Sequence, residues 1–250
     1  DSVMNYDAFM EPMTWFLTGM EKHSDEYKDY MLGNIENYEN TMTHYMASFA
    51  TSSLQCAMNQ LSNHDHSRFL TRTNHKVGRA ANLGTQAASE GVNKGIMKEA
   101  VVIQMTWPGA PTLYYGDEAG LCGFTDPDNR RTYPWGKEDK VLIRFHRDMI
   151  RIHRENPALR TGSVKFLRGD RNILCYARFN RAQQFIIVVN NDGYTRSMEI
   201  GVCGAGVPSS CQMTQIMYSS EDNYSMAPVT YQVERSCLKL TLPKYSAVVL

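Results

Sequence analysis

A short polar segment at residues 63–68, with the sequence Asn-His-Asp-His-Ser-Arg, holds the side chains best suited to chemistry. It directly follows residues 56–62, which read as a strand. His64, Asp65 and His66 could be metal ligands, because imidazole and carboxylate groups are ordinary zinc ligands. Consecutive residues rarely converge on one ion, however, and no Glu or Cys stands nearby at helical spacing. On local sequence alone, the favoured interpretation is a polar loop whose Asp65 caps a following helix.

A second candidate segment, residues 109–120, places glycines at both ends of a short apolar strand that leads into two adjacent carboxylates. The glycines allow the backbone to turn tightly on either side of the strand. Asp117 and Glu118 are not expected to act together as acid and base, because neighbouring side chains of an extended chain point to opposite faces. The oxygen-rich loop could instead bind Ca²⁺. No other metal or cofactor is predicted.

A third candidate segment, residues 126–135, gathers charged and aromatic side chains in one loop (Asp-Pro-Asp-Asn-Arg-Arg-Thr-Tyr-Pro-Trp). Sugar hydroxyls need donors and acceptors, and the face of a pyranose ring needs an aromatic platform, so this composition suits a carbohydrate. The alternative is a salt-bridged surface loop, stiffened by proline, with Trp135 packed underneath. For Trp135 itself we prefer that alternative.

The elements that must position these segments alternate between strands and helices as far as Pro157. Strands are predicted at residues 3–6, 56–62 and 111–115, and helices at residues 7–20, 24–49, 92–105 and 138–156. Strands separated by helices indicate parallel βα units, which carry their sites in the loops at the carboxyl ends of the strands. The polar, glycine-rich loops of this chain follow its strands in that way.

Beyond Pro157 the hydrophobic period changes to two residues. Strands are predicted at residues 164–167, 173–179, 184–189, 196–200, 237–242 and 245–250, with turn signals at residues 168–170 and 191–193. A run of strands after βα units indicates a separate all-β domain with the architecture of a sandwich. The predicted division is therefore an α/β part at residues 1–160 and an all-β domain at residues 161–250.

The composition excludes several classes of partner. Of the 250 residues, 42% are hydrophobic, and 26 Lys and Arg balance 26 Asp and Glu, so no charge excess attracts nucleic acid or a membrane surface. No apolar run approaches the roughly 18 residues that cross a bilayer. The cysteines are scattered without a Cys-x-x-Cys pair, which favours reduced thiols and a cytoplasmic over a secreted location. The first residues are unlike a signal peptide.

In this order and spacing, the three segments together resemble the last part of the α-amylase family of glycoside hydrolases, especially its neopullulanase, cyclomaltodextrinase and amylopullulanase branches. Residues 63–65 are similar to the family's seventh-strand motif, residues 109–118 to its eighth-strand motif, and residues 126–135 to a loop that lines the donor-side sugar subsites. Residues 1–6 look like the sixth strand. The resemblance implies the C-terminal part, about three βα units, of a (β/α)8 TIM barrel followed by an all-β sandwich domain.

Carried over residue by residue, the resemblance implies that Asp65 is a catalytic carboxylate, which binds sugar hydroxyls at the cleavage subsite and favours an oxocarbenium-like ring. His64 would donate a hydrogen bond to the same sugar. Asp126 and Arg130 would hold a glucose further along the donor side, and Glu118 would be structural. A carboxylate in the role of Asp65 adds interactions that strengthen in the transition state.

The resemblance also implies hydrolysis of α-glucosidic bonds in starch, pullulan or cyclodextrins with retention. A retaining glycosidase needs a nucleophile and a general acid about 5 Å apart. The family takes both from its fourth and fifth strands, whereas this chain begins at the sixth. We therefore expect the isolated chain to be inactive and to need the missing N-terminal part of the barrel as its partner, because three βα units cannot close a barrel.

Two other functions stay open. One is a non-catalytic carbohydrate-binding or scaffold relative that uses the same fold. The other is an α-glucosyl transferase of the same family, which differs in how well the intermediate is shielded from water. An Asp and a Glu ending the fourth and fifth strands upstream would separate the enzyme from the scaffold.

Overall fold

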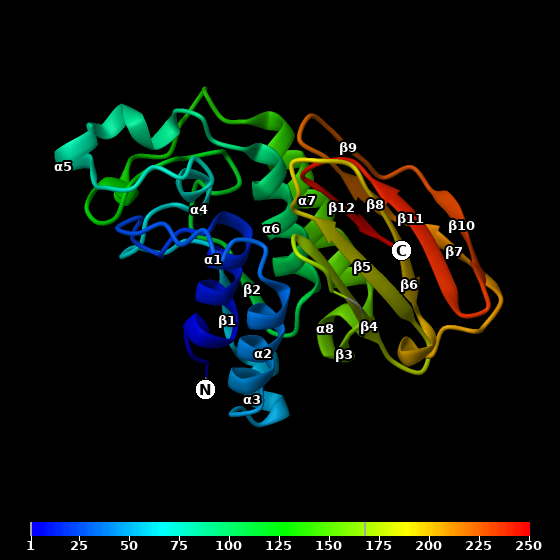
Figure 1. Cartoon of the computed structure of the whole chain (residues 1–250). Coiled ribbons are helices and arrows are strands. Elements are labelled where there is room, and N and C mark those ends of the chain that lie inside the picture. The colour runs from blue at the N-terminus through cyan, green and yellow to red at the C-terminus, as the bar shows by residue number, and fades with distance from the viewer. Residues whose placement is uncertain (1, 168) are drawn as a thin grey trace.

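The computed structural model describes residues 2–167 and 169–250 (Figure 1). A helical part with a small parallel sheet lies beside a part built from two antiparallel sheets, and helix α6 runs between them (Figure 1). The helices, nearly all before residue 162, are η1 (Tyr6–Met10), α1 (Glu11–Thr18), α2 (Ile35–Met46), α3 (Thr51–Cys56), α4 (Phe69–Arg72), α5 (Ala80–Leu83), η2 (Thr85–Ser89), α6 (Lys94–Thr106), η3 (Asp128–Arg130), α7 (Lys140–Glu155), α8 (Pro157–Thr161) and η4 (Cys203–Ala205).

The two long helices start where the sequence provides caps. The Asn93 side chain accepts hydrogen bonds from two backbone N–H groups at the start of α6, and Asp139 does the same for α7. Helix α6 is buried almost along its whole length, whereas α7 buries one stripe and leaves its charged face in water. Both helices agree with the predicted segments to within two residues at each end.

The parallel sheet is small. Strand β1 (Met58–Gln60) pairs in parallel with β2 (Ala110–Thr112), with Met58 opposite Ala110. The strand predicted at residues 3–6 is wrong in extent, since only Met4 forms a parallel bridge, to Met58. The chain enters η1 directly after Asn5, whose side-chain amide donates to Asn59 Oδ1 at 2.8 Å. Met4, β1 and β2 therefore lie side by side in the order in which they occur in the sequence, as the strands of consecutive βα units do.

The helix predicted at residues 24–49 is also wrong over residues 24–34. Helix α2 begins only at Ile35, where the Asn34 side chain caps it by accepting from Asn37 N at 3.1 Å. Ser24 has φ +64 and is buried in a turn, not at a helix start. Gly33 (φ +64) lies so close to Asn172 that a Cβ would overlap the Asn172 side chain. Residues 24–33, which the prediction placed in the helix, therefore lie in turns and bends instead.

The remaining strands form a sandwich of two antiparallel sheets. One sheet has the order β3 (Ser163–Phe166), β4 (Ile173–Phe179), β5 (Gln184–Asn190), β12 (Ser246–Val249), β8 (Met217–Ser219) and β9 (Tyr224–Ser225). The other has the order β6 (Arg196–Gly201), β11 (Cys237–Leu242), β10 (Val229–Glu234) and β7 (Cys211–Gln215). Facing side chains of both sheets, such as Val188 and Leu240, share one apolar core.

Strands β7 to β10 were not predicted from the sequence. In β10, four of six residues face solvent, and β7 alternates only over five residues, so neither has the apolar run that marks a buried strand. They are held by pairing: β7 pairs with β10, β10 forms a hairpin with β11, and β8 pairs with β9 and with β12, which is about 30 residues further along the chain.

The helical part and the six-stranded sheet share a second core. Trp107, which follows α6, is fully buried, and its ring packs edge-on against Tyr176 of β4 with centroids 4.9 Å apart. Tyr38 of α2 belongs to the same cluster, and Arg178 of β4 donates to the carbonyl of Thr106. The division at residues 160 and 161 stays a prediction, because this core crosses it.

No helix in residues 2–167 and 169–250 is long and apolar enough to cross a membrane. Cys56, Cys122, Cys203, Cys211 and Cys237 are free thiols. Burial raises the pKa of Cys122 to about 11, so this thiol stays protonated at neutral pH.

Gly95 tests the contact between α6 and the sandwich. A Cβ at this position would lie 2.9 Å from both Glu221 Cα and Tyr245 Cβ. We expect Gly95→Ala to lower the free energy of unfolding by about 1–2 kcal/mol, because crowding outweighs the gain in helix propensity. Urea denaturation measures this. Gly201→Ala, which meets nothing within 4 Å, is the control, and equal midpoints for the two variants would contradict the close contact.

Candidate functional site

The loop after β1 folds around the buried side chain of Asn63. Its Oδ1 accepts hydrogen bonds from the backbone N–H groups of Asp65 (2.9 Å) and His66 (3.0 Å), and its Nδ2 donates to Tyr6 Oη (3.1 Å). This Asx-type turn fixes the backbone immediately beyond the carboxyl end of β1. His64 and Asp65 consequently point outward, with side chains 53% and 51% exposed.

Asp65 is held through its backbone, and its carboxylate is left accessible. Its carbonyl oxygen accepts from Thr125 Oγ1 (2.5 Å) and from Asp126 N (3.2 Å). The interpretation of Asp65 as a helix cap is wrong: the first N–H of α4, that of Phe69, donates instead to Ser62 Oγ at 2.9 Å. The Asp65 carboxylate lies 3.4 Å from His64 Nε2.

The two histidines of the loop lie in different environments. His66 is buried, with its ring 5.3 Å from that of Tyr6 and 4.8 Å from that of His23, whereas His64 is exposed. The metal interpretation of this segment is therefore not supported by its geometry. Within the described ranges 2–167 and 169–250, no group of three or more His, Cys, Asp or Glu side chains is placed to hold a metal ion.

The third candidate segment packs directly on this loop. Asp126 and Arg130 form an ion pair of 2.5 Å, and each side chain is about half exposed. Arg130 Nε also donates to the carbonyl of His64 at 3.1 Å. The buried Asn129 amide bridges the carbonyls of Asn63 (3.1 Å) and His66 (2.7 Å). The structure thus brings together all four side chains proposed from the sequence, although 57 residues of chain (69–125) separate the two loops.

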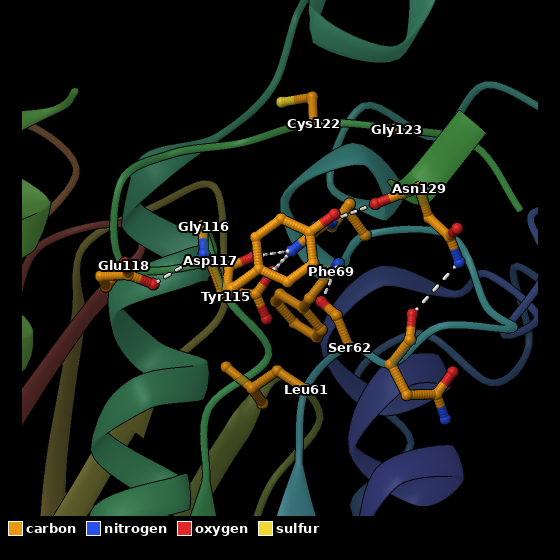
Figure 2. A network of polar contacts seen from close by, with 12 residues as sticks. Leu61, Ser62, Phe69, Tyr115, Gly116, Asp117, Glu118, Cys122, Gly123 and Asn129 are labelled. Atoms are coloured by element: carbon orange, nitrogen blue, oxygen red, sulfur yellow. Dashed lines mark hydrogen bonds and ion pairs between the residues drawn. The ribbon is translucent and has the colours of Figure 1, made fainter. Parts of the chain in front are cut away.

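Arg68 is the buried side chain that joins the loops, and the sequence analysis missed it. Its Nη1 contacts Asp117 Oδ1 at 3.0 Å and Tyr115 O at 2.6 Å, and its Nε donates to Asn129 O at 2.9 Å. Figure 2 shows Ser62, Tyr115, Asp117 and Asn129 as members of one network of polar contacts. A guanidinium suits this position, because it has several donors and keeps its charge when buried.

The environment of Arg68 is also aromatic and acidic. Its guanidinium lies over the rings of Tyr114 (4.1 Å to the centroid) and Tyr115 (4.8 Å). Burial raises the pKa of Asp117, and the charge of Arg68 opposes that rise. The only sequence signal for this pair is an arginine and an aspartate that each follow a predicted strand.

The second candidate segment consequently offers little to a cation. Asp117 is buried and paired with Arg68, and Glu118 accepts a hydrogen bond from Gly116 N at 2.9 Å (Figure 2). Ca²⁺ needs several free oxygen ligands, so the arrangement does not fit the Ca²⁺ site suggested for this loop. The structural role implied for Glu118 agrees with its contact to the turn.

Trp135 differs from its expected position. The side chain is 80% exposed and is not packed under the loop. Its ring leans against that of Tyr133, with centroids 4.5 Å apart and planes inclined by 50°. The tight turn at Pro134 and Gly136 directs the indole away from the body of the protein.

Arg68 is expected to dominate the stability of the site. Arg68→Met leaves Asp117 buried without its partner, which costs about 3–5 kcal/mol of unfolding free energy. Urea denaturation measures the loss. Arg79→Met, which removes the exposed pair with Asp25, should cost less than about 1 kcal/mol. Similar losses for the two variants would contradict the buried role of Arg68, and adding Asp117→Asn to Arg68→Met should recover part of the loss.

His66 makes the loop sensitive to acid. Burial, reinforced by the positive charge of Arg72, lowers the pKa of His66 to about 3 from its ordinary 6.5. Between these pH values the unfolded chain binds a proton that the folded chain excludes. Stability therefore falls as the pH drops below about 6.5, by up to about 1.4 kcal/mol per pH unit. Urea denaturation at pH 7, 5.5 and 4.5 should show a flatter dependence in His66→Gln, and an unchanged slope would refute this assignment.

Comparisons with known proteins show which family this chain resembles. A family model described as "Alpha amylase, catalytic domain" matches residues 1–163. An amylopullulanase from Thermoanaerobacter thermohydrosulfuricus is 41% identical over 121 residues, which are 48% of this chain and 8% of that protein. Neopullulanase 2 from Thermoactinomyces vulgaris is 30% identical over 210 residues, 82% of this chain and 31% of that protein.

The solved structures give the same fold. The debranching enzyme of Nostoc punctiforme has a TM-score of 0.74 to this chain at 25% identity, and the match covers all of this chain and 47% of that one. The chain therefore spans less than half the length of these relatives. The predicted fold class, part of a (β/α)8 barrel followed by a β domain, is confirmed, and so is the resemblance drawn from the three motifs.

Proposed function

The chain belongs to the α-amylase catalytic-domain family, and from this premise we propose that the complete protein hydrolyses α-glucosidic bonds in starch, pullulan or cyclodextrins. The observation that carries the proposal is the convergence of Asp65, His64, Asp126 and Arg130 on one exposed surface. This surface lies beyond the carboxyl ends of β1 and β2, where barrel enzymes place their active sites.

Asp65 is assigned to transition-state stabilisation in a retaining mechanism. Its carboxylate is accessible, and two hydrogen bonds to its own carbonyl and the turn at Asn63 fix its backbone. A carboxylate that needs no reorganisation can bind sugar hydroxyls and favour the positive charge that develops at the ring. His64 Nε2, 3.4 Å from Asp65, is close enough to donate to the same sugar.

Asp126 and Arg130 are assigned to the next glucose on the donor side. Their ion pair presents acceptor and donor atoms together, which matches the alternating hydroxyls of a sugar. The contact from Arg130 Nε to the His64 carbonyl ties this subsite to the one at Asp65. Substrate binding at one subsite should therefore change the affinity for sugar at the other.

The nucleophile and the general acid are assigned to an N-terminal part of the barrel outside these 250 residues. The described chain contributes two paired parallel strands and one bridge, which cannot close a barrel. Leu113, next to the free edge of β2, is 38% exposed and belongs with Pro111 and Ile150 to an apolar groove. An N-terminal part that completes the barrel would pair this edge.

Asp65→Asn in the complete protein tests the catalytic assignment. We expect kcat on maltoheptaose to fall by about 10²–10³-fold or more, because an interaction that strengthens in the transition state is lost. The melting temperature should stay close to that of the parent, since the carboxylate has no buried partner. Asp222→Asn, an exposed aspartate of the sandwich, is the control. Turnover by Asp65→Asn close to that of the parent would exclude the assignment and favour a non-catalytic relative.

The isolated 250-residue chain tests the assignment of the missing residues. We expect it to release no sugar from pullulan or cyclodextrin and to self-associate, because an open sheet edge and an apolar groove face water. Reducing-sugar assays and light scattering measure the two properties. A monodisperse, active monomer would show that no N-terminal part is needed.

A further inference from the structure

Residues 21–25 contact the loop of Asp65 from a third part of the chain, the segment between α1 and α2. The N–H and the hydroxyl of Ser67 both donate to the carbonyl of Lys22, at 3.1 and 3.0 Å. The Ser24 hydroxyl in turn donates to Ser67 Oγ at 2.9 Å, and both serines are fully buried. These contacts fix the segment against the loop, because breaking one of them would leave a buried polar group without a partner.

His23 lies in the middle of this segment in a fixed orientation. Its backbone N–H donates to Glu21 Oε2 at 2.7 Å, which shapes the turn. Its ring packs edge-on against the buried ring of His66, with centroids 4.8 Å apart and planes inclined by 82°. In this orientation His23 Nδ1 lies 2.8 Å from Thr125 Oγ1, which belongs to the segment after β2. The imidazole therefore connects the segment after α1 with the segment after β2.

The directions of the hydrogen bonds at Thr125 follow from its single hydroxyl proton. That proton is donated to the carbonyl oxygen of Asp65 at 2.5 Å. The hydroxyl can then only accept from His23, so the proton on this side of the imidazole is assigned to Nδ1. Two hydrogen bonds thus run from the imidazole through Thr125 to the main chain of Asp65, and each polarises the other.

Thr125 is the point at which this chain of hydrogen bonds acts on the site. It is buried and directly precedes Asp126, whose N–H donates to the same Asp65 carbonyl at 3.2 Å. A threonine hydroxyl rotates freely, so without a donor on its oxygen it could turn its proton towards another acceptor. The His23 Nδ1–H group occupies one lone pair of that oxygen and keeps the proton directed at Asp65.

We propose that His23 is a positioning residue for the reaction, which directs the Thr125 hydroxyl at the Asp65 carbonyl and so holds the Asp65 carboxylate in place at the cleavage subsite. His23 does not touch the sugar in this role. The inference rests on the proposed α-glucan hydrolase function. Because the interactions of Asp65 strengthen in the transition state, loss of the hydrogen bonds should lower kcat and leave KM nearly unchanged.

Removal of either partner in the complete protein tests the role. His23→Leu and Thr125→Val should each lower kcat on maltoheptaose by about three- to tenfold, the value of one hydrogen bond, and change KM by less than about twofold. The double variant should lose no more than the larger single loss, because both changes break the same chain of hydrogen bonds. His44→Leu, at an exposed histidine of α2, is the matched control and should keep the parental kcat.

Two amide replacements separate positioning from a general effect on the fold. An asparagine places its amide nitrogen where histidine has Nδ1, so His23→Asn should recover most of the parental kcat. The amide nitrogen of His23→Gln lies one bond farther along the side chain, so this variant should behave like His23→Leu. A loss that followed packing would show the reverse order, because glutamine is closer to histidine in volume. All variants are assayed at a temperature at which circular dichroism shows them folded.

The outcomes separate the role of His23 from the proposed function. If the parent is active and His23→Leu keeps its kcat, the role is excluded and the function stands. The same holds if His23→Gln matches or exceeds His23→Asn, or if the two single losses multiply in the double variant. Nitrogen-15 shifts of the His23 ring give a readout without turnover: a proton on Nδ1 is expected, and a neutral ring protonated on Nε2 overturns the role. If the parent hydrolyses no α-glucan, the proposed function fails, and the role of His23 in it fails as well.

Discussion

The buried pair of Arg68 and Asp117 is the interaction on which the site depends. Arg68, in the loop after β1, contacts the segment after β2 through Asp117 and the Tyr115 carbonyl, and the segment of residues 126–135 through the Asn129 carbonyl. Such a pair contributes little net stability against an apolar replacement, but it fixes geometry, because Nε and Nη1 of Arg68 each have specific partners and an unpaired charge there is costly. The loops that follow β1 and β2 are therefore locked to one another.

This arrangement separates the charges of the loops into two groups. Arg68 and Asp117 are buried and hold the backbone, whereas His64, Asp65, Asp126 and Arg130 are about half exposed and stand on that backbone. A rigid base under accessible groups is what catalysis by preorganised polar groups requires. The proposed binding of a sugar at this site therefore requires no rearrangement of the loops.

The sandwich stabilises the position of the site through the core that its six-stranded sheet shares with the helical part. Trp107 at the end of α6 packs on Tyr176 of β4, and Gly95 at the start of the same helix touches Glu221 and Tyr245. Helix α6 leads into β2 and so into the loop that holds Asp117. Because α6 is buried on all sides, the sheet fixes the helix, and the helix fixes where β2 ends.

The sequence alone determined the family, the alternation of βα units, most of the strand positions and the four residues of the proposed site, because period, caps and motif spacing are local properties. Tertiary structure decided the rest. Residues 24–33 lie in turns, where Gly33 packs against Asn172, and β7 to β10 form through pairing with one another and with β11 and β12 and not through an apolar run of their own. Arg68, to which the sequence analysis gave no role, is buried and joins the loops, whereas Trp135, which was expected to pack under its loop, is exposed. Burial depends on what the rest of the chain covers, and no local pattern in either segment contains that information.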